Sequence, residues 1–265
     1  MNNNAHFPCD GSNHRAAERA QHDLSKDYGQ ELTRVYGSPV AKVVQMGTTQ
    51  YKADNKIHLT DGHTYYASLK LKKNLRNGSF DWINTTNPLF EDVFKDANEI
   101  YRQGKDSGNP ALKEPLVEAI DRGWRHLSPS QVTELVERHV IRPYTDEHCE
   151  ILIMDKSHRT LYRIDPTKTN FFRYIHGGGA LELRCGARGG KMSRQIVGIG
   201  LNGVEISFGL RVRYHLNNGY GAWHHGSGPR ANSSSYLCFK VQQDNVLGFL
   251  KQNEASFLGG TELPH

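Results

Sequence analysis

Hydrophobic and polar residues alternate along two short stretches, 56–60 and 64–72, which are separated by Asp61-Gly62. Alternation with a period of two is typical of a β-strand with one buried face, and Asp-Gly is a strong signal for a tight hairpin turn. In the second stretch Ser68 and Lys70 share one face of the expected strand. The pattern therefore predicts a β-hairpin that carries a lysine near its far end.

Helical and turn patterns surround this hairpin. Residues 13–36 have the spacing of a helix that ends before Gly37-Ser38-Pro39, and 40–46 resemble a strand. The turn-forming residues of 76–88 predict an ordered loop. Further helices are expected around 89–103, at 115–124, and after Ser128-Pro129-Ser130, with Ser130 as the N-cap.

The second half of the chain has mostly the pattern of β-strands. Two strands are expected in 149–165, and 194–215 resembles a long hairpin that turns at Leu201-Asn202-Gly203. The sequence therefore predicts an α/β fold class, with a mixed sheet flanked by helices in residues 1–143. A mostly β region packed on this core is expected in residues 144–265.

Composition narrows the class of protein. The 265 residues, of which 37% are hydrophobic, suffice for one large domain or two closely packed ones. No run of about 18 apolar residues is present, and the polar N-terminus lacks the apolar stretch of a signal peptide, so no membrane association is expected. The four cysteines are far apart in sequence, which favours reduced thiols and a cytoplasmic location.

Positive charge is concentrated in one region. The net charge of the chain is +5, whereas residues 171–240 contain nine Lys and Arg against two Glu, a net charge of +7. Such an uneven distribution is typical of a surface that binds a polyanion. A solvated basic face is the alternative interpretation.

Two short motifs are associated with the predicted hairpin. Lys52-Ala53-Asp54 precedes it, and Ser68-Leu69-Lys70, after an interval of thirteen residues, lies in its second strand. With the helix and strand that come before, this order resembles the PD-(D/E)XK nuclease superfamily, and especially its type II restriction endonuclease-like members. The resemblance covers about residues 25–75 and implies a nuclease core built around a mixed sheet.

The resemblance implies roles for three residues. Asp54 would bind Mg²⁺, with the backbone carbonyl of Leu69 as a possible second ligand. Hard cations of this kind prefer oxygen ligands, and phosphodiester hydrolysis uses the metal to neutralise charge and to acidify water. Lys70 would orient or help to deprotonate that water and stabilise the pentacovalent phosphorus.

Ser68 departs from the family pattern, which has Asp or Glu at this position. A hydroxyl is a poor substitute for an anionic ligand, so we expect another carboxylate to complete the catalytic set. Related nucleases place a helical Glu beside the metal, so the resemblance implies Glu31, late in the first helix, as the substitute, with Glu18 as the second choice. Should no acid reach the site, catalysis itself is in question.

The basic region provides candidate DNA contacts of two kinds. A glycine-rich loop lets the backbone approach phosphates closely, and two arginines that alternate along one strand share a face. A two-stranded ribbon fits the major groove, where Arg can bind guanine; contact with phosphates alone is the alternative. The candidate DNA-binding residues are Arg188, Lys191 and Arg194 in the loop, Arg211 and Arg213 on the strand, and Arg230 and Asn232 further on.

Together these features predict a Mg²⁺-dependent, sequence-specific endonuclease that cuts double-stranded DNA as a homodimer. Two alternatives remain: a non-catalytic DNA-binding protein on a degraded nuclease fold, and a structure-selective repair nuclease. A zinc site at His148, Cys149 and His158 is disfavoured, because these residues lack the close pairing of structural zinc ligands.

Overall fold

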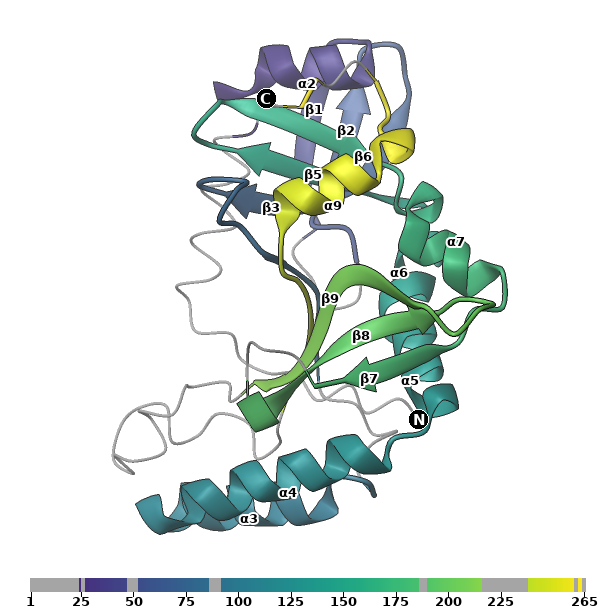
Figure 1. Cartoon of the computed structure of the whole chain (residues 1–265). Coiled ribbons are helices and arrows are strands. Elements are labelled where there is room, and N and C mark those ends of the chain that lie inside the picture. Colours follow the sequence, from purple (N-terminus) through teal and green to yellow (C-terminus); the bar gives the residue numbers. More distant parts are fainter. Residues whose placement is uncertain are drawn as a thin grey trace. The chain divides into compact units, whose positions relative to one another are not determined.

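The chain folds into two compact units, each assembled from segments that are far apart in sequence (Figure 1). Unit 1 comprises Met1–Phe80, Glu137–Gly178 and Asn245–His265, and unit 2 comprises Asp81–Val136 and Gly179–Asp244. The predicted division near residue 143 differs from this one, because both units recruit strands from both halves of the chain. The computed structural model describes residues 24, 27–46, 52–85, 92–185, 190–215, 238–259 and 262–263.

Unit 1 contains a five-stranded mixed sheet with the order β1-β2-β3-β5-β6. Strands β3 and β5 pair in parallel, and the other neighbours pair antiparallel. β5 is buried along almost its whole length, as is usual for a parallel strand covered on both faces, whereas in β3 only Ala67 and Ser68 are buried. The strands are β1 (Val40–Gln45), β2 (Asn55–Leu59), β3 (Thr64–Lys72), β5 (Cys149–Asp155) and β6 (Thr160–Ile164).

The predicted hairpin is confirmed as β2 and β3. Its register pairs Ile57 with Tyr65, and the turn contains Gly62 with a φ of 91°, a conformation that glycine adopts without strain. The Asp61 carboxylate accepts a hydrogen bond of 3.0 Å from the His63 N–H and so closes the turn.

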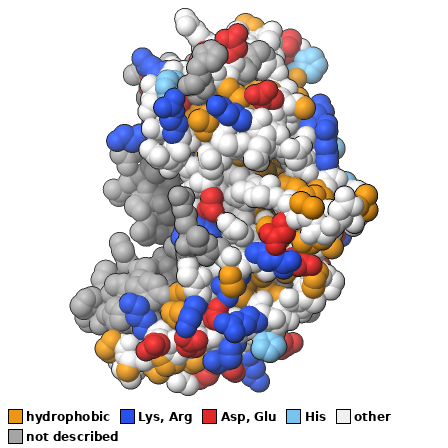
Figure 2. Space-filling view, in the orientation of Figure 1, with side chains coloured by type: hydrophobic (Ala, Val, Ile, Leu, Met, Phe, Trp, Pro, Cys, Tyr) orange, Lys and Arg blue, Asp and Glu red, His pale blue; other side chains and the backbone are white. Residues whose placement is uncertain are grey.

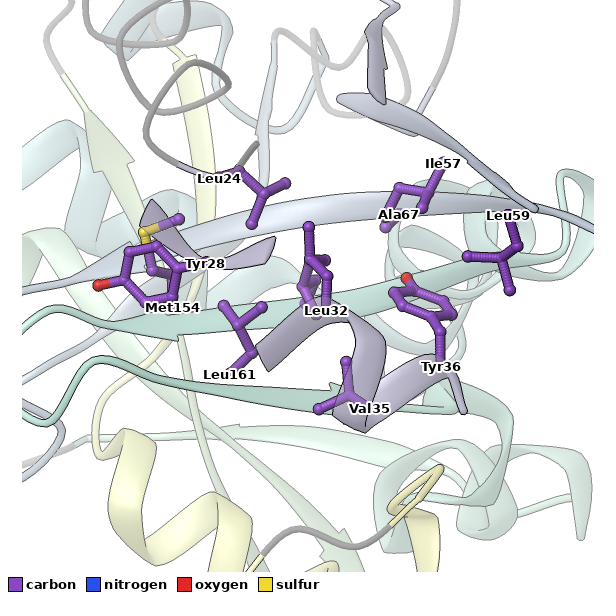
Figure 3. Close-up of a cluster of buried hydrophobic side chains, with 11 residues drawn as sticks. Leu24, Tyr28, Leu32, Val35, Tyr36, Ile57, Leu59, Ala67, Met154 and Leu161 are labelled. Carbon is purple, nitrogen blue, oxygen red and sulfur yellow. The ribbon is translucent and has the colours of Figure 1, made fainter. Parts of the chain in front are cut away.

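The hydrophobic core of unit 1 lies between its sheet and helix α2 (Gly29–Tyr36). Leu32 and Val35 of this helix point toward Ile57, Ala67 and other apolar side chains of the strands (Figure 3). The other helical segments of unit 1 are a π-helical turn (Glu137–Ile141), α6 (Arg142–Asp146), α7 (Asn170–His176), α9 (Val246–Gln252) and two 3₁₀ turns (Pro166–Lys168 and Glu254–Ser256).

Unit 2 is built on a second five-stranded sheet, with the order β4-β10-β9-β8-β7. The long hairpin predicted around Leu201-Asn202-Gly203 is confirmed as β8 and β9. Neighbouring pairs from β7 to β10 are antiparallel. The strands are β4 (Phe80–Thr85), β7 (Leu181–Arg184), β8 (Ser193–Ile199), β9 (Glu205–His215) and β10 (Cys238–Gln243).

Strand β4 replaces the middle of the loop that was predicted over 76–88, of which residues 86–88 lie outside the described residues. Phe80 and Trp82 are buried, whereas Asp81 between them pairs with Lys240 at 2.8 Å. This alternation is the pattern of a half-buried strand. The many turn-forming residues on either side of it obscured the signal, and the partner strand β10 lies more than 150 residues away.

Helices cover the apolar face of the unit 2 sheet. α3 (Lys95–Ser107) and α4 (Lys113–His126) run side by side, and the Trp124 ring lies 5.3 Å from that of Tyr214 on β9. α5 (Pro129–Val136) begins after Ser128, which exchanges hydrogen bonds with Gln131 and thereby takes the capping role expected of Ser130. Short 3₁₀ turns occupy Pro110–Leu112 and Gly190–Met192.

The α/β fold class is therefore confirmed: one mixed sheet and one antiparallel sheet, both flanked by helices. Within the described ranges, every helix falls short of the length and apolar character that crossing a membrane requires.

Candidate functional site

Asp54 lies immediately before β2 and is fixed to β3 by three hydrogen bonds. Its N–H donates to the Ala67 carbonyl at 3.0 Å. Its carboxylate oxygen Oδ2 accepts from the Leu69 N–H at 2.7 Å and from the Ser68 hydroxyl at 3.1 Å. The side chain is exposed, and no described residue donates to the other oxygen, Oδ1. A carboxylate is thus held in one direction with one oxygen open to a ligand.

Ser68 is buried (1% exposed) directly beneath this carboxylate. The Tyr144 ring, from α6, is also buried next to it. Burial raises the pKa of the Tyr144 hydroxyl well above its usual value, and the nearby Ser68 hydroxyl opposes that rise only in part. The Tyr144 hydroxyl is therefore neutral at pH 7, and the role that the structure gives Ser68 is to orient Asp54.

Lys70 is half-buried on β3, two residues after Ser68 and on the same face of the strand. Its ammonium lies close enough to that of Lys52 for each charge to affect the other. The Lys52 ammonium lies 4.8 Å from the centre of the Tyr144 ring. Burial first, and then the charge of Lys70, lower the pKa of Lys52 to about 7 against the opposing effect of Asp54.

The Leu69 carbonyl points toward the same side of β3 as Asp54. The N–H and C=O of one residue in a strand lie on the same side, and the Leu69 N–H donates to Asp54. Strand β2 begins at Asn55, which pairs with Ala67, so Leu69 lies beyond the end of this pairing. The sequence-based expectation of a carboxylate next to a backbone carbonyl therefore fits the local geometry.

Glu31 lies elsewhere in unit 1. Its carboxylate pairs with Arg34 at 2.7 Å and accepts a hydrogen bond from the Leu161 N–H at 3.4 Å. The hydrogen bond from Arg34 holds the pKa of Glu31 below its usual value. Leu161 is on β6, three strand spacings or about 14 Å from β2. The structure therefore does not bring Glu31 to Asp54, and Glu18 lies outside the described residues.

We define the Asp54 centre as Lys52, Asp54, Ser68 and Lys70 together with the Leu69 carbonyl. Its carboxylate and carbonyl oxygens fit one type of metal. Mg²⁺ is commonly held by one or two carboxylates, with water and substrate phosphate supplying the other oxygens. In the described part of the chain, no group of three or more His, Cys, Asp or Glu side chains is arranged to hold a metal. An all-protein cage is thus absent there, whereas a site shared with phosphate is compatible with Asp54 and Leu69.

Two residues of the disfavoured zinc site have other surroundings. Burial raises the pKa of the Cys149 thiol to about 12, which opposes the thiolate form that binds metals. The His158 ring instead contacts the buried Asp155 carboxylate at 2.7 Å, within the turn that joins β5 to β6.

The candidate DNA-binding residues have different environments in unit 2. Arg194 is buried (4% exposed) and pairs with Asp121 of α4, so we leave it out of any surface for DNA. Lys191 is exposed and pairs with Glu118. Arg211 pairs with Asp244 at 2.9 Å, whereas Arg213 forms no ion pair with a described residue. Arg188, Arg230 and Asn232 lie outside the described residues.

Arg211, Arg213 and Lys240 share one face of the unit 2 sheet, which we call the cationic face. Arg213 lies opposite Lys240 across β9 and β10, and residues directly opposite each other in an antiparallel pair share a face. Val212 and Tyr214 project from the other face and are buried. The predicted alternation of the two arginines is therefore confirmed.

Sequence reasoning missed Glu147 and Tyr144 as neighbours of Asp54. The Glu147 carboxylate accepts hydrogen bonds of 2.8 Å from the Lys52 N–H and of 3.2 Å from the Ala53 N–H. Both residues lie about 90 positions further along the chain and reach the site because β5 pairs with β3. No local pattern signals that pairing.

The chain matches no family model, no curated protein and no solved structure.

Proposed function

We propose that the protein is a Mg²⁺-dependent endonuclease that hydrolyses double-stranded DNA at specific sequences, in the manner of a type II restriction enzyme. The observation that carries the proposal is the Asp54 carboxylate, held on β3 with one open oxygen, at a place where the charges of both Asp54 and Lys70 act on Lys52. The resemblance of the two motifs to PD-(D/E)XK nucleases supports it.

In this proposal Asp54 and the Leu69 carbonyl hold Mg²⁺. When bound, the metal neutralises charge on the scissile phosphate and acidifies water. Lys70 orients the attacking water and stabilises the negative charge that develops on the phosphate oxygens. Ser68 does not replace the missing family carboxylate as a ligand; it holds Asp54 Oδ2, so that Oδ1 faces the metal.

The cationic face of unit 2 supplies DNA contacts, with Arg213 as the central candidate and Lys240 opposite it. A homodimer would give each strand of a symmetric site one catalytic centre. Cys149 and Cys185 are free thiols in the described structure, in keeping with a reducing, cytoplasmic location.

Incubation of the protein with plasmid DNA tests the proposal. Discrete fragments in Mg²⁺ that vanish in EDTA are expected, and the same fragments should be missing with Asp54→Ala. A ladder or smear would favour the structure-selective repair nuclease, which shares the chemistry but not the sequence recognition.

A non-catalytic DNA-binding protein on a degraded nuclease fold is the second candidate. The position of Glu31 over β6 favours it, because that leaves Asp54 as the one carboxylate of the predicted catalytic set at the site. Sequence-specific binding in gel-shift experiments, without cleavage in Mg²⁺ or Mn²⁺, would select this candidate.

A further inference from the structure

The segment that leads into Asp54 is held by a carboxylate from a distant part of unit 1. Both oxygens of Glu147 accept a hydrogen bond from the Lys52 N–H at 2.8 Å, and Oε2 also accepts from the Ala53 N–H at 3.2 Å. Ala53 is 3% exposed, so its N–H needs a partner within the protein. Hydrogen bonds to a carboxylate are stronger than those between neutral groups.

This contact ties Asp54 to the strand pair that carries Lys70. Glu147 lies between α6 and β5, two residues before Cys149, which pairs with Tyr66 of β3. β3 in turn carries Ser68 and Lys70. The Glu147 carboxylate thus holds the backbone that precedes Asp54, while the Ala67 carbonyl binds the Asp54 N–H and the Leu69 N–H binds the Asp54 carboxylate.

We propose that Glu147 is a positioning residue for the Asp54 centre. It fixes the backbone of residues 52–53, and this sets the direction of the Asp54 carboxylate relative to Lys70. The inference rests on the proposed function, which it deepens. Direct ligation of a metal by Glu147 is the less suitable role, because both of its oxygens already accept N–H groups.

The variants Glu147→Ala and Glu147→Gln test this role, with Asp146→Ala as the matched control. Asp146 is the exposed carboxylate of the preceding residue. An alanine at 147 removes both acceptors, whereas the glutamine side chain keeps one oxygen that accepts N–H groups. If Glu147→Ala fails to fold, as judged by thermal unfolding, Glu147→Gln carries the comparison.

Two measurements distinguish the hydrogen bonds of Glu147 to residues 52 and 53 from their effect on metal binding and catalysis. The first is hydrogen exchange of the peptide that contains residues 52 and 53, measured without metal or DNA. Exchange should be faster in Glu147→Ala, intermediate in Glu147→Gln, and unchanged in Asp146→Ala. The second is Mn²⁺ affinity together with kcat and KM on a cognate duplex.

We expect Glu147→Ala to lower kcat about 100-fold, the loss that a misplacement of about 1 Å produces. KM for DNA should stay unchanged, and kcat should be about tenfold higher in Glu147→Gln than in Glu147→Ala. Faster exchange with wild-type kcat and Mn²⁺ affinity would overturn the positioning role alone. A glutamine variant as inactive as the alanine variant, but with protected amides, would show that Glu147 acts through its charge. Wild-type protein that neither binds Mn²⁺ nor cuts DNA would overturn the proposed function, leaving nothing for Glu147 to position.

Discussion

The Asp54 centre and the cationic face use charged side chains in opposite ways. At the Asp54 centre the carboxylate is held by N–H and hydroxyl donors, which leaves its charge unneutralised by a direct ion pair among described residues. In residues 171–240, most of which belong to unit 2, much of the basic charge is neutralised by ion pairs within the protein. Five of the nine Lys and Arg in 171–240 pair with carboxylates: Arg184, Lys191, Arg194, Arg211 and Lys240.

The acids in these pairs explain why the charge excess along the sequence overstates the basic surface. Four of them, Asp81, Glu118, Asp121 and Asp244, come from outside residues 171–240. Over α3 and α4 in Figure 2, Lys and Arg side chains are interspersed with Asp and Glu. A segment with a net charge of +7 is therefore largely compensated once the sheet of unit 2 forms, and the number of candidate DNA contacts shrinks.

Removal of the Asp54 carboxylate should have the largest effect. Asp54→Ala is expected to lower the cleavage rate at least about a thousandfold, because a metal ligand contributes several kcal/mol in the transition state. DNA affinity in Ca²⁺ or without metal should be unchanged. Single-turnover cleavage and gel-shift titrations measure the two quantities. Asp61→Ala, at the turn of the same hairpin, is the control, and a similar loss of rate there would show that the hairpin merely misfolded.

The buried ion pair between Arg194 and Asp121 in unit 2 should contribute to the stability of the fold rather than to catalysis. Asp121→Asn leaves the Arg194 guanidinium buried without a counter-charge and is expected to cost about 3–5 kcal/mol of unfolding free energy. Urea unfolding of the wild type and the variant measures this. Arg122→Ala removes an exposed arginine of the same helix and serves as the control. A loss within about 0.5 kcal/mol in Asp121→Asn would mean that Arg194 is solvated, and would return it to the candidates for DNA binding.

The same pair predicts how stability depends on pH. Burial acts to raise the pKa of Asp121, but the hydrogen bond and charge of Arg194 outweigh it and lower the pKa below its usual value. The unfolded state therefore binds the proton at a higher pH than the native state. The stabilisation is present above the unfolded pKa of about 3.9, and is lost as the pH falls toward the lower native pKa. Denaturant unfolding at several pH values should show this loss in the wild type and a flatter profile in Asp121→Asn.

Much of the fold could be predicted because its signals are local. The hairpin of β2 and β3 follows from alternation and Asp61-Gly62, and the β8–β9 hairpin follows from Asn202-Gly203. Strand β4 was missed because turn-forming residues flank a six-residue alternation. At the Asp54 centre, local spacing predicted that Asp54 lies beside the second strand of the hairpin, and the Ser68 hydroxyl of that strand donates a hydrogen bond to Asp54.

The structural features that could not be predicted depend on contacts between segments that are far apart in sequence. The parallel pairing of β3 with β5 brings Glu147 to the amides of Lys52 and Ala53, and no periodicity in the sequence encodes which strands become neighbours. Glu31 is predicted at the site only by the resemblance to nucleases that place a helical Glu beside the metal. In three dimensions that helix turns the carboxylate toward β6, where Arg34 and the Leu161 N–H bind it.

The smallest effect is expected for DNA affinity when either arginine of the cationic face is replaced, and it should differ between the two. Arg211 is held by Asp244, whereas Arg213 has no acidic partner among the described residues, so Arg213 has more of its charge available to DNA. If Arg213 reads a base, Arg213→Ala should cost about 1–3 kcal/mol on the cognate duplex and relax discrimination at one base pair. If it contacts a phosphate, the loss of affinity should be equal on all sequences. The slope of log affinity against log salt concentration should then become shallower by about one unit.

Titrations of Arg213→Ala and Arg211→Ala on cognate and scrambled duplexes, at two salt concentrations, distinguish these outcomes. Asp244→Asn is the informative companion, because it frees Arg211 without removing it. Stronger non-specific binding by Asp244→Asn would show that the ion pair withholds Arg211 from DNA. Weaker binding on the cognate duplex alone would show instead that Asp244 aims the guanidinium at a base. Wild-type binding by all three variants would remove the cationic face from the proposed DNA interface, while leaving the assignment of the Asp54 centre untouched.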